Sequence, residues 1–453
     1  MMDRDGYRKA LLAVGIAGFV LRAALVIVFP PDLEALGTGD ADFYVRAART
    51  FAELGVFQAP PLPPFPKPPG LPLALVVLLK LTGENAIAVG LVMAAAGSSG
   101  IWLMAAIARR VWPERRSLHL AAATVFAFDP VQVYFCRAVL TEGLVTILVL
   151  ALLLMLLRGP GLGHIALAGA TIGALTLIRT DLLALLLLVP FVILRSPRIG
   201  PVRLSGTAGS LALSAAVCLL TVAPWSLYAS HQTGEFVLTA PPPRGSGFSR
   251  WLTTLDLTPS QWRHAAWNFP RGEVDPSFVD TINLPSDEKR AARELLGRAM
   301  NGSREELSRA RIGFLEMARQ RTADAPIRTF LWLPAKRSLQ LWARYHETVG
   351  PGDRRLFIPW SPGVVVFSIW KLPFIPLALL GFLAAFYLVA DKRVAVATLA
   401  ALVLLRTFSL LWAGAAAGYS LMETRYLAMA QPAAMLLALE ALRRAVMARR
   451  RLS

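Results

Sequence analysis

The sequence predicts an all-α protein that crosses a membrane about ten times. Hydrophobic residues make up 55% of its 453 residues and charged residues only 17%, below the ~25% that is usual in soluble domains. Apolar runs recur along the chain, and many approach the ~20 helical residues needed to cross about 30 Å of hydrocarbon. Lysines and arginines mostly flank these runs. This pattern is typical of a polytopic membrane protein.

Ten apolar runs are expected to span the membrane. In chain order they are 10–29, 85–108, 118–135, 138–157, 164–179, 181–194, 207–229, 363–390, 394–413 and 424–446. The first is long for a signal-peptide core and no small-x-small cleavage site follows it directly, so we expect a retained anchor. A further run, 71–81, is too short to cross. It is either an interfacial helix or the start of a kinked second span.

The basic residues predict the orientation, because Lys and Arg near span ends collect on the cytoplasmic side. The flanking ones all fall on one side of a ten-span topology, namely Arg4, Arg8, Lys9, Arg109, Arg110, Arg115, Arg116, Arg195, Arg198, Arg203, Lys392, Arg393, Arg443, Arg444, Arg449, Arg450 and Arg451. We therefore expect both termini in the cytoplasm and the chain in a bacterial-type inner (cytoplasmic) membrane.

This topology divides the chain into three parts. Residues 1–229 form an N-terminal transmembrane region, with a first outer loop at 30–70 that carries interfacial helices. Residues 230–360 form a large extracytoplasmic loop, and residues 361–453 form a C-terminal transmembrane region.

The large loop has its own helical pattern. Residues 287–322 are rich in Arg, Glu, Leu and Ala, and both Glu294 and Glu305 are followed by an arginine four residues later. Such pairs favour solvated helices, which we expect to break near Asn301.

The composition excludes several classes of function. No Walker loop, G-x-G-x-x-G stretch or zinc-type Cys/His cluster is present. The formal net charge of +18 would suggest nucleic acid in a soluble protein, but here the arginines flank spans. They indicate topology and contact with anionic membrane lipids. Cys136 and Cys218 are interpreted as small packing residues.

The first outer loop carries two carboxylates, Asp40 and Asp42, just beyond the first span. One interpretation of Asp40 is a helix N-cap, whose carboxylate accepts backbone N–H groups. The other is a general base that takes a proton from an acceptor hydroxyl during group transfer. Asp42 would lie in the first helical turn, where the helix dipole favours a negative charge.

Polar residues also mark the outer ends of several spans: Asp129, Arg137, Glu142, Arg179, Asp181, Glu423, Arg425 and Tyr426. Ionisable groups at such depth usually face a protein interior or a wet cavity, although any one of them could be a snorkelling side chain. Cations with one or two carboxylates suit a phosphate leaving group and a hydroxyl acceptor. A transporter would place its polar groups near the midplane, often with internal repeats. Clustering at one face favours an enzyme.

Five short motifs occur in order along the chain: Gly39-Asp40-Ala41-Asp42-Phe43-Tyr44, Lys67-Pro68-Pro69-Gly70-Leu71-Pro72, Asp129-Pro130 with Thr141-Glu142, Leu177-Ile178-Arg179-Thr180-Asp181, and Glu423-Thr424-Arg425-Tyr426 with Pro432. Through them the sequence resembles the membrane glycosyltransferases of the C superfamily. It is most similar to the bacterial branch with the protein O-mannosyltransferase-like enzymes and the lipid A aminoarabinose transferase. The order and placement of the motifs carry this resemblance, which covers most of the chain.

The resemblance implies an enzyme that takes a sugar from a polyprenyl-phosphate carrier at the extracytoplasmic face and inverts the anomeric centre. It implies that Asp40 is the catalytic base, with Tyr44 as the aromatic four residues later. Many members have Asp-Glu where this chain has Asp40-Ala41, so a second carboxylate, if needed, would be Asp42. The aminoarabinose transferase has a metal-binding Glu before its lysine where this chain has Pro66. That difference argues against a metal there, and a divalent metal stays open as a cofactor.

The remaining site residues follow from the same reasoning. The lysine of the Lys-Pro-Pro motif is linked to the carrier phosphate in the family, which implies the same role for Lys67. Because Lys67 shares the outer face with Arg137, Arg179 and Arg425, these four are the expected phosphate ligands. The expected substrate pocket comprises Tyr44, Glu142, Asp181, Glu423 and Tyr426.

The expected partners are a polyprenyl-phosphate sugar donor and an acceptor on lipid, polysaccharide or protein. Two alternatives remain open from the sequence: a transporter or flippase of a lipid-linked saccharide, and a non-catalytic relative that scaffolds envelope assembly.

The topology is tested by cysteine labelling in intact cells. Ser246→Cys lies in the predicted outer loop and Ser117→Cys on the predicted cytoplasmic side. A membrane-impermeant thiol reagent should label only the first, because the bilayer blocks its access to the second. Labelling of Ser117→Cys in intact cells would reverse the predicted orientation.

Overall fold

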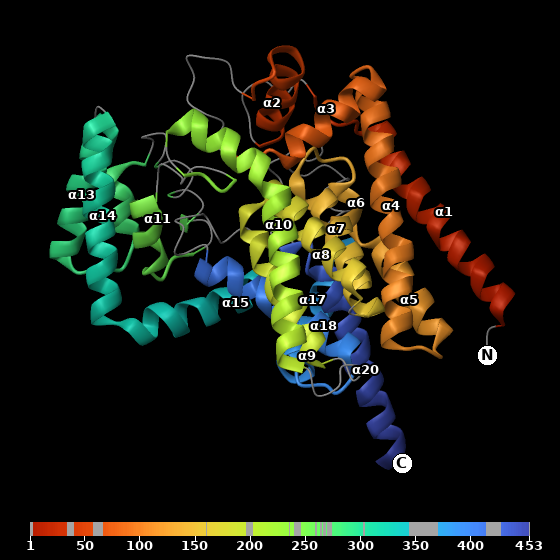
Figure 1. The fold of residues 1–453 in the computed structure, drawn as a ribbon. Coiled ribbons are helices and arrows are strands. Elements are labelled where there is room, and N and C mark those ends of the chain that lie inside the picture. The colour runs from red at the N-terminus through yellow and green to blue at the C-terminus, as the bar shows by residue number, and fades with distance from the viewer. Residues whose placement is uncertain are drawn as a thin grey trace. The chain divides into compact units, whose positions relative to one another are not determined.

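The computed structural model describes residues 3–33, 40–57, 67–159, 161–195, 203–234, 236–239, 246–258, 261–262, 265, 269, 274–301, 304–343, 370–413 and 427–452. Within these ranges the chain is helical and contains no strand, which confirms the predicted fold class (Figure 1). The protein is a multi-pass membrane protein.

The chain divides into two compact units. Unit 1 comprises Met1–Pro241, Ala343–Arg406 and Arg425–Ser453, and unit 2 comprises Pro242–Trp342 and Thr407–Thr424. Most of unit 2 therefore comes from the segment predicted to be the large outer loop.

Unit 1 contains the apolar helices. They are α1 (Arg4–Val28), α2 (Asp40–Leu54), α3 (Gly70–Thr82), α4 (Ala86–Val111), α5 (Arg116–Phe128), α6 (Pro130–Phe135), α7 (Thr141–Arg158), α8 (Leu162–Ile178), the 3-10 helix η1 (Thr180–Leu187), α9 (Leu188–Arg195), α10 (Arg203–Thr233), α17 (Phe374–Leu388), α18 (Val394–Phe408) and α20 (Gln431–Leu452). Among the described residues, five helical stretches are long and apolar enough to cross a membrane: Arg4–Val28, Ala86–Val111, Thr141–Arg158, Gly206–Thr233 and Val394–Leu411.

The predicted span 118–135 is two helices instead of one. The helix breaks at Asp129, where the backbone is extended and the carboxylate Oδ1 accepts from the backbone N–H of Val131 at 2.9 Å. Pro130 follows, which disfavours helical backbone at the preceding residue and has no N–H to donate. The 181–194 span likewise begins as a 3-10 helix.

The break at Asp129 leaves carbonyls of α5 without helical partners, and a buried arginine satisfies them. The Arg22 guanidinium donates to the carbonyls of Phe126 at 3.1 Å and Ala127 at 2.8 Å. It also donates to the Gly18 carbonyl and to the Cys136 sulfur. Helix ends buried in an apolar bundle need such donors, because no water reaches them. Cys136 is buried and free, and its sulfur is also a hydrogen-bond partner of Arg22.

Small residues allow the helices of unit 1 to pack closely. A Cβ atom on Gly169 of α8 would lie 2.4 Å from the Ser214 carbonyl oxygen of α10. A Cβ on Gly381 of α17 would lie 1.8 Å from the Ala434 carbonyl oxygen of α20. Close backbone contact at glycine is a common way for membrane helices to associate.

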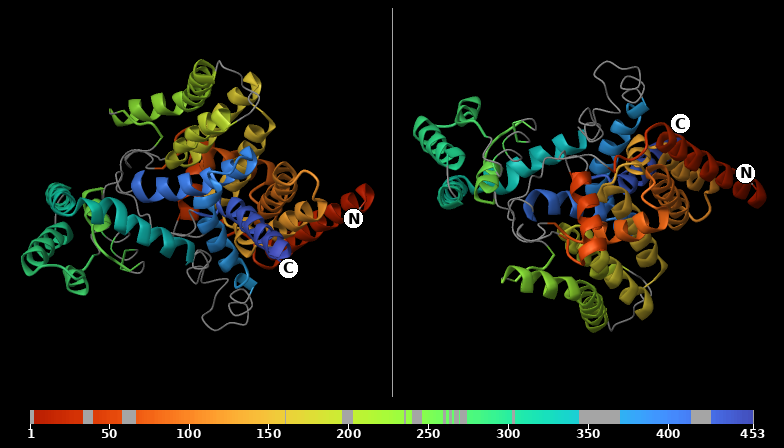
Figure 2. Two further views of the ribbon diagram at one scale, coloured as in Figure 1. Left: turned by 90° about the horizontal axis from the view of Figure 1, so that it is seen from below. Right: turned by 90° about the horizontal axis from the view of Figure 1, so that it is seen from above.

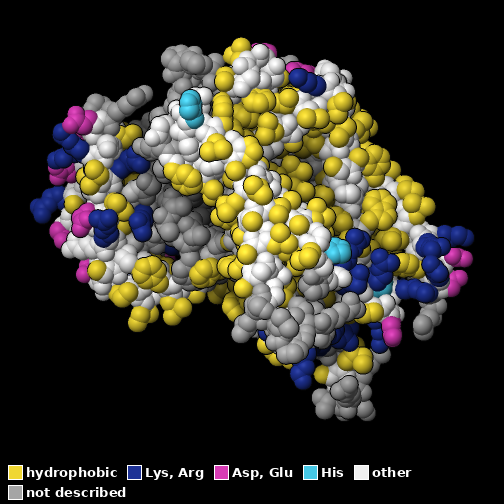
Figure 3. Space-filling view, viewed as in Figure 1, with side chains coloured by type: hydrophobic (Ala, Val, Ile, Leu, Met, Phe, Trp, Pro, Cys, Tyr) yellow, Lys and Arg dark blue, Asp and Glu magenta, His cyan; other side chains and the backbone are white. Residues whose placement is uncertain are grey.

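The ends of unit 1 differ in chemistry. Figure 1 shows α2 and α3 at one end and both chain termini at the other. Lys and Arg side chains gather around the start of α1 and the turn between α4 and α5, while hydrophobic side chains cover the face over α10 (Figure 3). Leu219, Leu220 and Leu227 of α10 are exposed, as expected for a surface that faces lipid.

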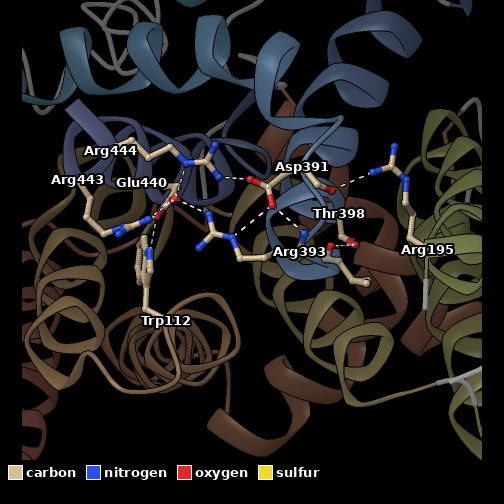
Figure 4. Close-up of polar contacts among 9 residues, drawn as sticks. Trp112, Arg195, Asp391, Arg393, Thr398, Glu440, Arg443 and Arg444 are labelled. Atoms are coloured by element: carbon tan, nitrogen blue, oxygen red, sulfur yellow. Dashed lines mark hydrogen bonds and ion pairs between the residues drawn. The ribbon is translucent and has the colours of Figure 1, made fainter. Parts of the chain in front are cut away.

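An ion network lies around the middle of α20 (Figure 4). The Glu440 carboxylate accepts from four side chains: Trp112 Nε1 at 2.6 Å, Arg443 Nε at 2.8 Å, Arg444 Nε at 2.7 Å, and Arg393. The network joins α4, the turn before α18 and α20.

Unit 2 has a hydrophobic core of its own. Its elements are α11 (Ser246–Thr253), the 3-10 helix η3 (Pro276–Thr281), α13 (Ser286–Asn301), α14 (Arg304–Asp324), the π-helical turn η4 (Arg328–Trp332), α15 (Leu333–Ala343) and the π-helical turn η6 (Ser409–Ala413). Figure 2 shows α13 and α14 side by side. Phe248 stacks on Phe269, and both contact Phe314. The predicted helix break near Asn301 is confirmed, since α13 ends there.

Candidate active site

The first candidate pair joins the two motifs of the first outer loop. Asp40 is the first residue of α2, and its Oδ1 atom accepts from the ammonium of Lys67, which precedes α3. Both side chains are about a quarter exposed, Asp40 at 22% and Lys67 at 26%. The pair is thus partly open to solvent or to a ligand.

Two aromatic rings surround the Lys67 ammonium. Its Nζ atom lies 4.9 Å from the centroid of the Phe43 ring and 4.8 Å from that of Tyr44. Ring faces at this distance attract a cation and hold its direction. Tyr44 is itself buried in a cluster with Val45, Leu71 and other residues of α2, α3 and α4. The packing of α2 on α3 therefore determines where Lys67 and Asp40 lie.

Asp42 has a different environment from Asp40. It is only 7% exposed, and its Oδ2 atom lies 2.8 Å from Nη2 of Arg46, one turn further along α2. Such a pair stabilises the helix locally.

A glycine brings the Lys-Pro-Pro motif next to the Arg179 motif. A Cβ atom on Gly70 would lie 2.7 Å from a side-chain atom of Ile178 and 2.9 Å from the Leu177 carbonyl oxygen. Only a glycine fits at this distance from the backbone. Because Lys67 is three residues before Gly70 and Arg179 directly follows Ile178, the two cations come from segments that pack against each other.

Arg179 belongs to a row of alternating charges. Its Nη1 atom lies 3.6 Å from Oε1 of Glu142, and its Nε and Nη2 atoms lie 3.3 Å from the two carboxylate oxygens of Asp181. Arg406 of α18 donates to the same Oδ2 atom of Asp181. The row thus connects the start of α7, the end of α8 and the far end of α18.

Arg137 is held by backbone carbonyls. Its Nε atom donates to the Phe29 carbonyl at 2.8 Å and its Nη2 atom to the Pro30 carbonyl at 3.3 Å. These contacts lie at the end of α1, and Arg137 is 6% exposed.

The structure brings together Asp40, Lys67 and Tyr44 in one group, and Glu142, Arg179 and Asp181 in another. Glu423, Arg425 and Tyr426 lie outside the described residues. Sequence reasoning missed Arg406, although one signal existed: it is the only charged residue of the apolar run 394–413. Among the described residues, no three His, Cys, Asp or Glu side chains gather as a metal site would require.

No protein-family model matches the sequence, and no curated protein matches it. The chain is similar to solved structures of ArnT from Cupriavidus metallidurans. The apo state has 17% identity and a TM-score of 0.41, covering 96% of this chain and 77% of that one. The form bound to undecaprenyl phosphate has 16% identity and a TM-score of 0.39, covering 97% and 78%.

It is also similar to the oligosaccharyltransferase AglB from Archaeoglobus fulgidus, in complex with an inhibitory peptide and a dolichol-phosphate. Here the identity is 14% and the TM-score 0.46, covering 98% of this chain and 51% of that chain, so this chain spans about half of AglB. ArnT and AglB are C-superfamily glycosyltransferases, the family that the sequence motifs resemble. At these identities and TM-scores, the likeness transfers no activity to this chain.

The charge row predicts a coupled effect on stability. Arg406→Met should destabilise unit 1 by about 3 kcal/mol, because it leaves the Asp181 carboxylate with one cation fewer in an apolar surrounding. Adding Asp181→Asn should recover much of this loss, because it removes the charge that Arg406 compensates. The measurement is thermal unfolding in detergent of the unchanged protein, the single variants Arg406→Met and Asp181→Asn, and the double variant. A double variant that loses the sum of the two single effects would show that the pair contributes no coupling.

Proposed function

We propose that the protein is a membrane glycosyltransferase. It moves a sugar from a polyprenyl-phosphate carrier to an acceptor hydroxyl on a lipid, a polysaccharide or a protein, and it inverts the anomeric centre. The proposed site faces away from the cytoplasm across the inner membrane. The observation that carries the proposal is the Asp40–Lys67 pair, because one contact holds a proton acceptor beside a cation at the end of unit 1 opposite the termini.

Lys67 binds the carrier phosphate in this proposal. The Lys67 ammonium, set between the rings of Phe43 and Tyr44, can exchange the Asp40 carboxylate for a phosphate oxygen. A cation there stabilises the negative charge that develops on the phosphate as it leaves. The exchange would also release Asp40 from its partner when the donor is in place.

Asp40 is the proposed general base. The acceptor oxygen forms a bond to the anomeric carbon from the face opposite the phosphate, while the bond from that carbon to the phosphate oxygen breaks. The electron pair of the broken bond stays on the polyprenyl phosphate, and the acceptor proton moves to the Asp40 carboxylate. Attack from the opposite face is what inverts the configuration. Asp42, paired with Arg46, is the second catalytic candidate.

Arg179 is the second phosphate ligand that we favour. Glu142 and Asp181 hold its guanidinium from two directions, and the Gly70 contact brings its segment against that of Lys67. Arg137 and Arg425 are proposed as further ligands, and Tyr44, Glu142, Asp181, Glu423 and Tyr426 as residues of the substrate pocket. Buried contacts to backbone carbonyls make Arg137 the least exchangeable of the ligands that the structure describes.

Asp40→Asn tests the general base. The substitution keeps the size of the side chain but cannot accept the proton, so turnover should fall by about 10²–10⁴-fold. Donor binding should stay equal or become tighter, because Lys67 loses a competing carboxylate. The measurement is transfer from radiolabelled polyprenyl-phosphate sugars in membrane preparations.

Asp42→Asn is the matched control, since it removes a neighbouring charge from the same helix. Full activity of Asp40→Asn would leave Asp40 only a structural role at the start of α2, which Asn can also fill. An active Asp40→Asn with an inactive Asp42→Asn would move the base by two residues. Movement of intact lipid-linked sugar across the membrane without turnover would instead support the flippase alternative.

Lys67→Ala tests the phosphate contact. A charge-assisted hydrogen bond contributes about 1.5–3 kcal/mol, so polyprenyl phosphate should bind roughly ten- to a hundredfold more weakly. Lys80→Ala, at an exposed position in the last turn of α3, should bind like the unchanged protein. Equal binding by both variants would remove Lys67 from the donor site.

A further inference from the structure

Unit 2 carries an exposed apolar patch that its own core does not explain. The patch consists of Ile327, Phe330, Leu331, Trp332 and Leu339, whose side chains are between 49 and 74% exposed. Four of them lie in or next to the π-helical turn η4, and Leu339 lies further along α15. Figure 3 shows hydrophobic side chains gathered over this part of unit 2. A cluster of large apolar side chains in water is unfavourable unless something covers it.

The opposite face of the same segment is firmly attached to unit 2. The Arg337 guanidinium donates to the carbonyls of Thr253 at 2.8 Å and Leu255 at 2.6 Å. Lys336 lies 2.8 Å from the Asp256 carboxylate. Leu333 and Leu341 are buried. The patch is therefore the outer face of an amphipathic helix whose inner face is fixed, so its exposure is built into the fold.

The π-helical turn widens the apolar face. Leu333 closes this turn by donating its backbone N–H to the Arg328 carbonyl, five residues earlier. Such a turn accommodates one residue more than an α-helical turn. Three successive large side chains, from Phe330 to Trp332, consequently stay exposed before α15 buries Leu333.

The far end of α15 lies at the end of a membrane span. Nε1 of Trp342 donates to Oγ1 of Thr407 at 3.0 Å. Thr407 is in the last turn of α18, within the stretch Val394–Leu411 that is apolar enough to cross a membrane. The other end of α18 follows Lys392 and Arg393, which belong at a membrane boundary. Trp342 thus ties α15 to the last turn of α18.

We infer that this patch docks onto the lipid bilayer, with Phe330, Leu331 and Trp332 inserted at the boundary between headgroups and acyl chains. Trp and Phe beside cations are typical of helices that lie in this zone. Arg328 is exposed within the patch and is placed to meet a lipid phosphate. The bilayer is favoured over a second copy of the chain, because the Trp342–Thr407 contact joins the helix to the end of a stretch that is long and apolar enough to cross a membrane. The inference is independent of the proposed transferase activity.

The test places one fluorescent label in the full chain, reconstituted in nanodiscs of phosphatidylethanolamine and phosphatidylglycerol with one copy per disc. Leu331→Cys carries an environment-sensitive label in the patch. Ile312→Cys is the matched control, since Ile312 is equally exposed and lies about 18 Å along α14 from the end of that helix. Both native cysteines are buried, so the unchanged chain gives the background.

The label at 331 should be quenched by lipids that carry a quencher on the acyl chain. Iodide should also quench the label at 331 at least about threefold less strongly than the label at 312, as expected for insertion among acyl chains. Equal iodide quenching at both positions would overturn the inference, because the patch would then face water. Protection from iodide without quenching by lipid would also overturn it, because protein would then cover the patch. The label at 312 should be quenched by iodide but not by the quencher-carrying lipids, as expected for an exposed position away from the bilayer.

Discussion

A charged group inside an apolar helix bundle must find an opposite charge or backbone partners, because hydrocarbon offers neither water nor counterions. The buried side chains of unit 1 meet this requirement in two ways. Arg22 and Arg137 donate to backbone carbonyls at helix ends. Arg179 and Arg406 instead pair with carboxylates. The breaks and junctions of the fold lie where these partners are available.

Carbonyl and carboxylate partners differ in whether another anion can replace them. A carbonyl at a helix end cannot leave without unwinding the helix, so an arginine bound to it is fixed. A carboxylate that shares a cation with solvent can be replaced by another anion. The Asp40–Lys67 pair is about a quarter exposed on both sides, whereas Arg406 is only 1% exposed. The fold therefore separates a pair that is open on both sides from a pair whose arginine is closed off, while the Asp181 side chain of that second pair is 27% exposed.

The sequence predicts the elements that depend on a pattern of neighbouring residues in the chain. Runs of about 20 apolar residues predict α1, α4 and α10, and the break near Asn301 follows from a local pattern of charge and turn residues. It did not predict the break at Asp129, because the carbonyls freed there are satisfied by Arg22, more than 100 residues earlier. Arg406 was missed for the same reason, since its partner Asp181 lies 225 residues away. Partners across such separations depend on tertiary packing.

The candidate site was predicted as a set of residues at one face, and packing decides which of them meet. Gly70 is the point where this happens. Without a side chain there, the start of α3 approaches the backbone at Leu177, and the Lys67 and Arg179 segments become neighbours. A larger residue would push apart two segments that are over 100 residues apart in the chain. Their chemistry therefore rests on a contact between backbones, which charge patterns alone could not reveal.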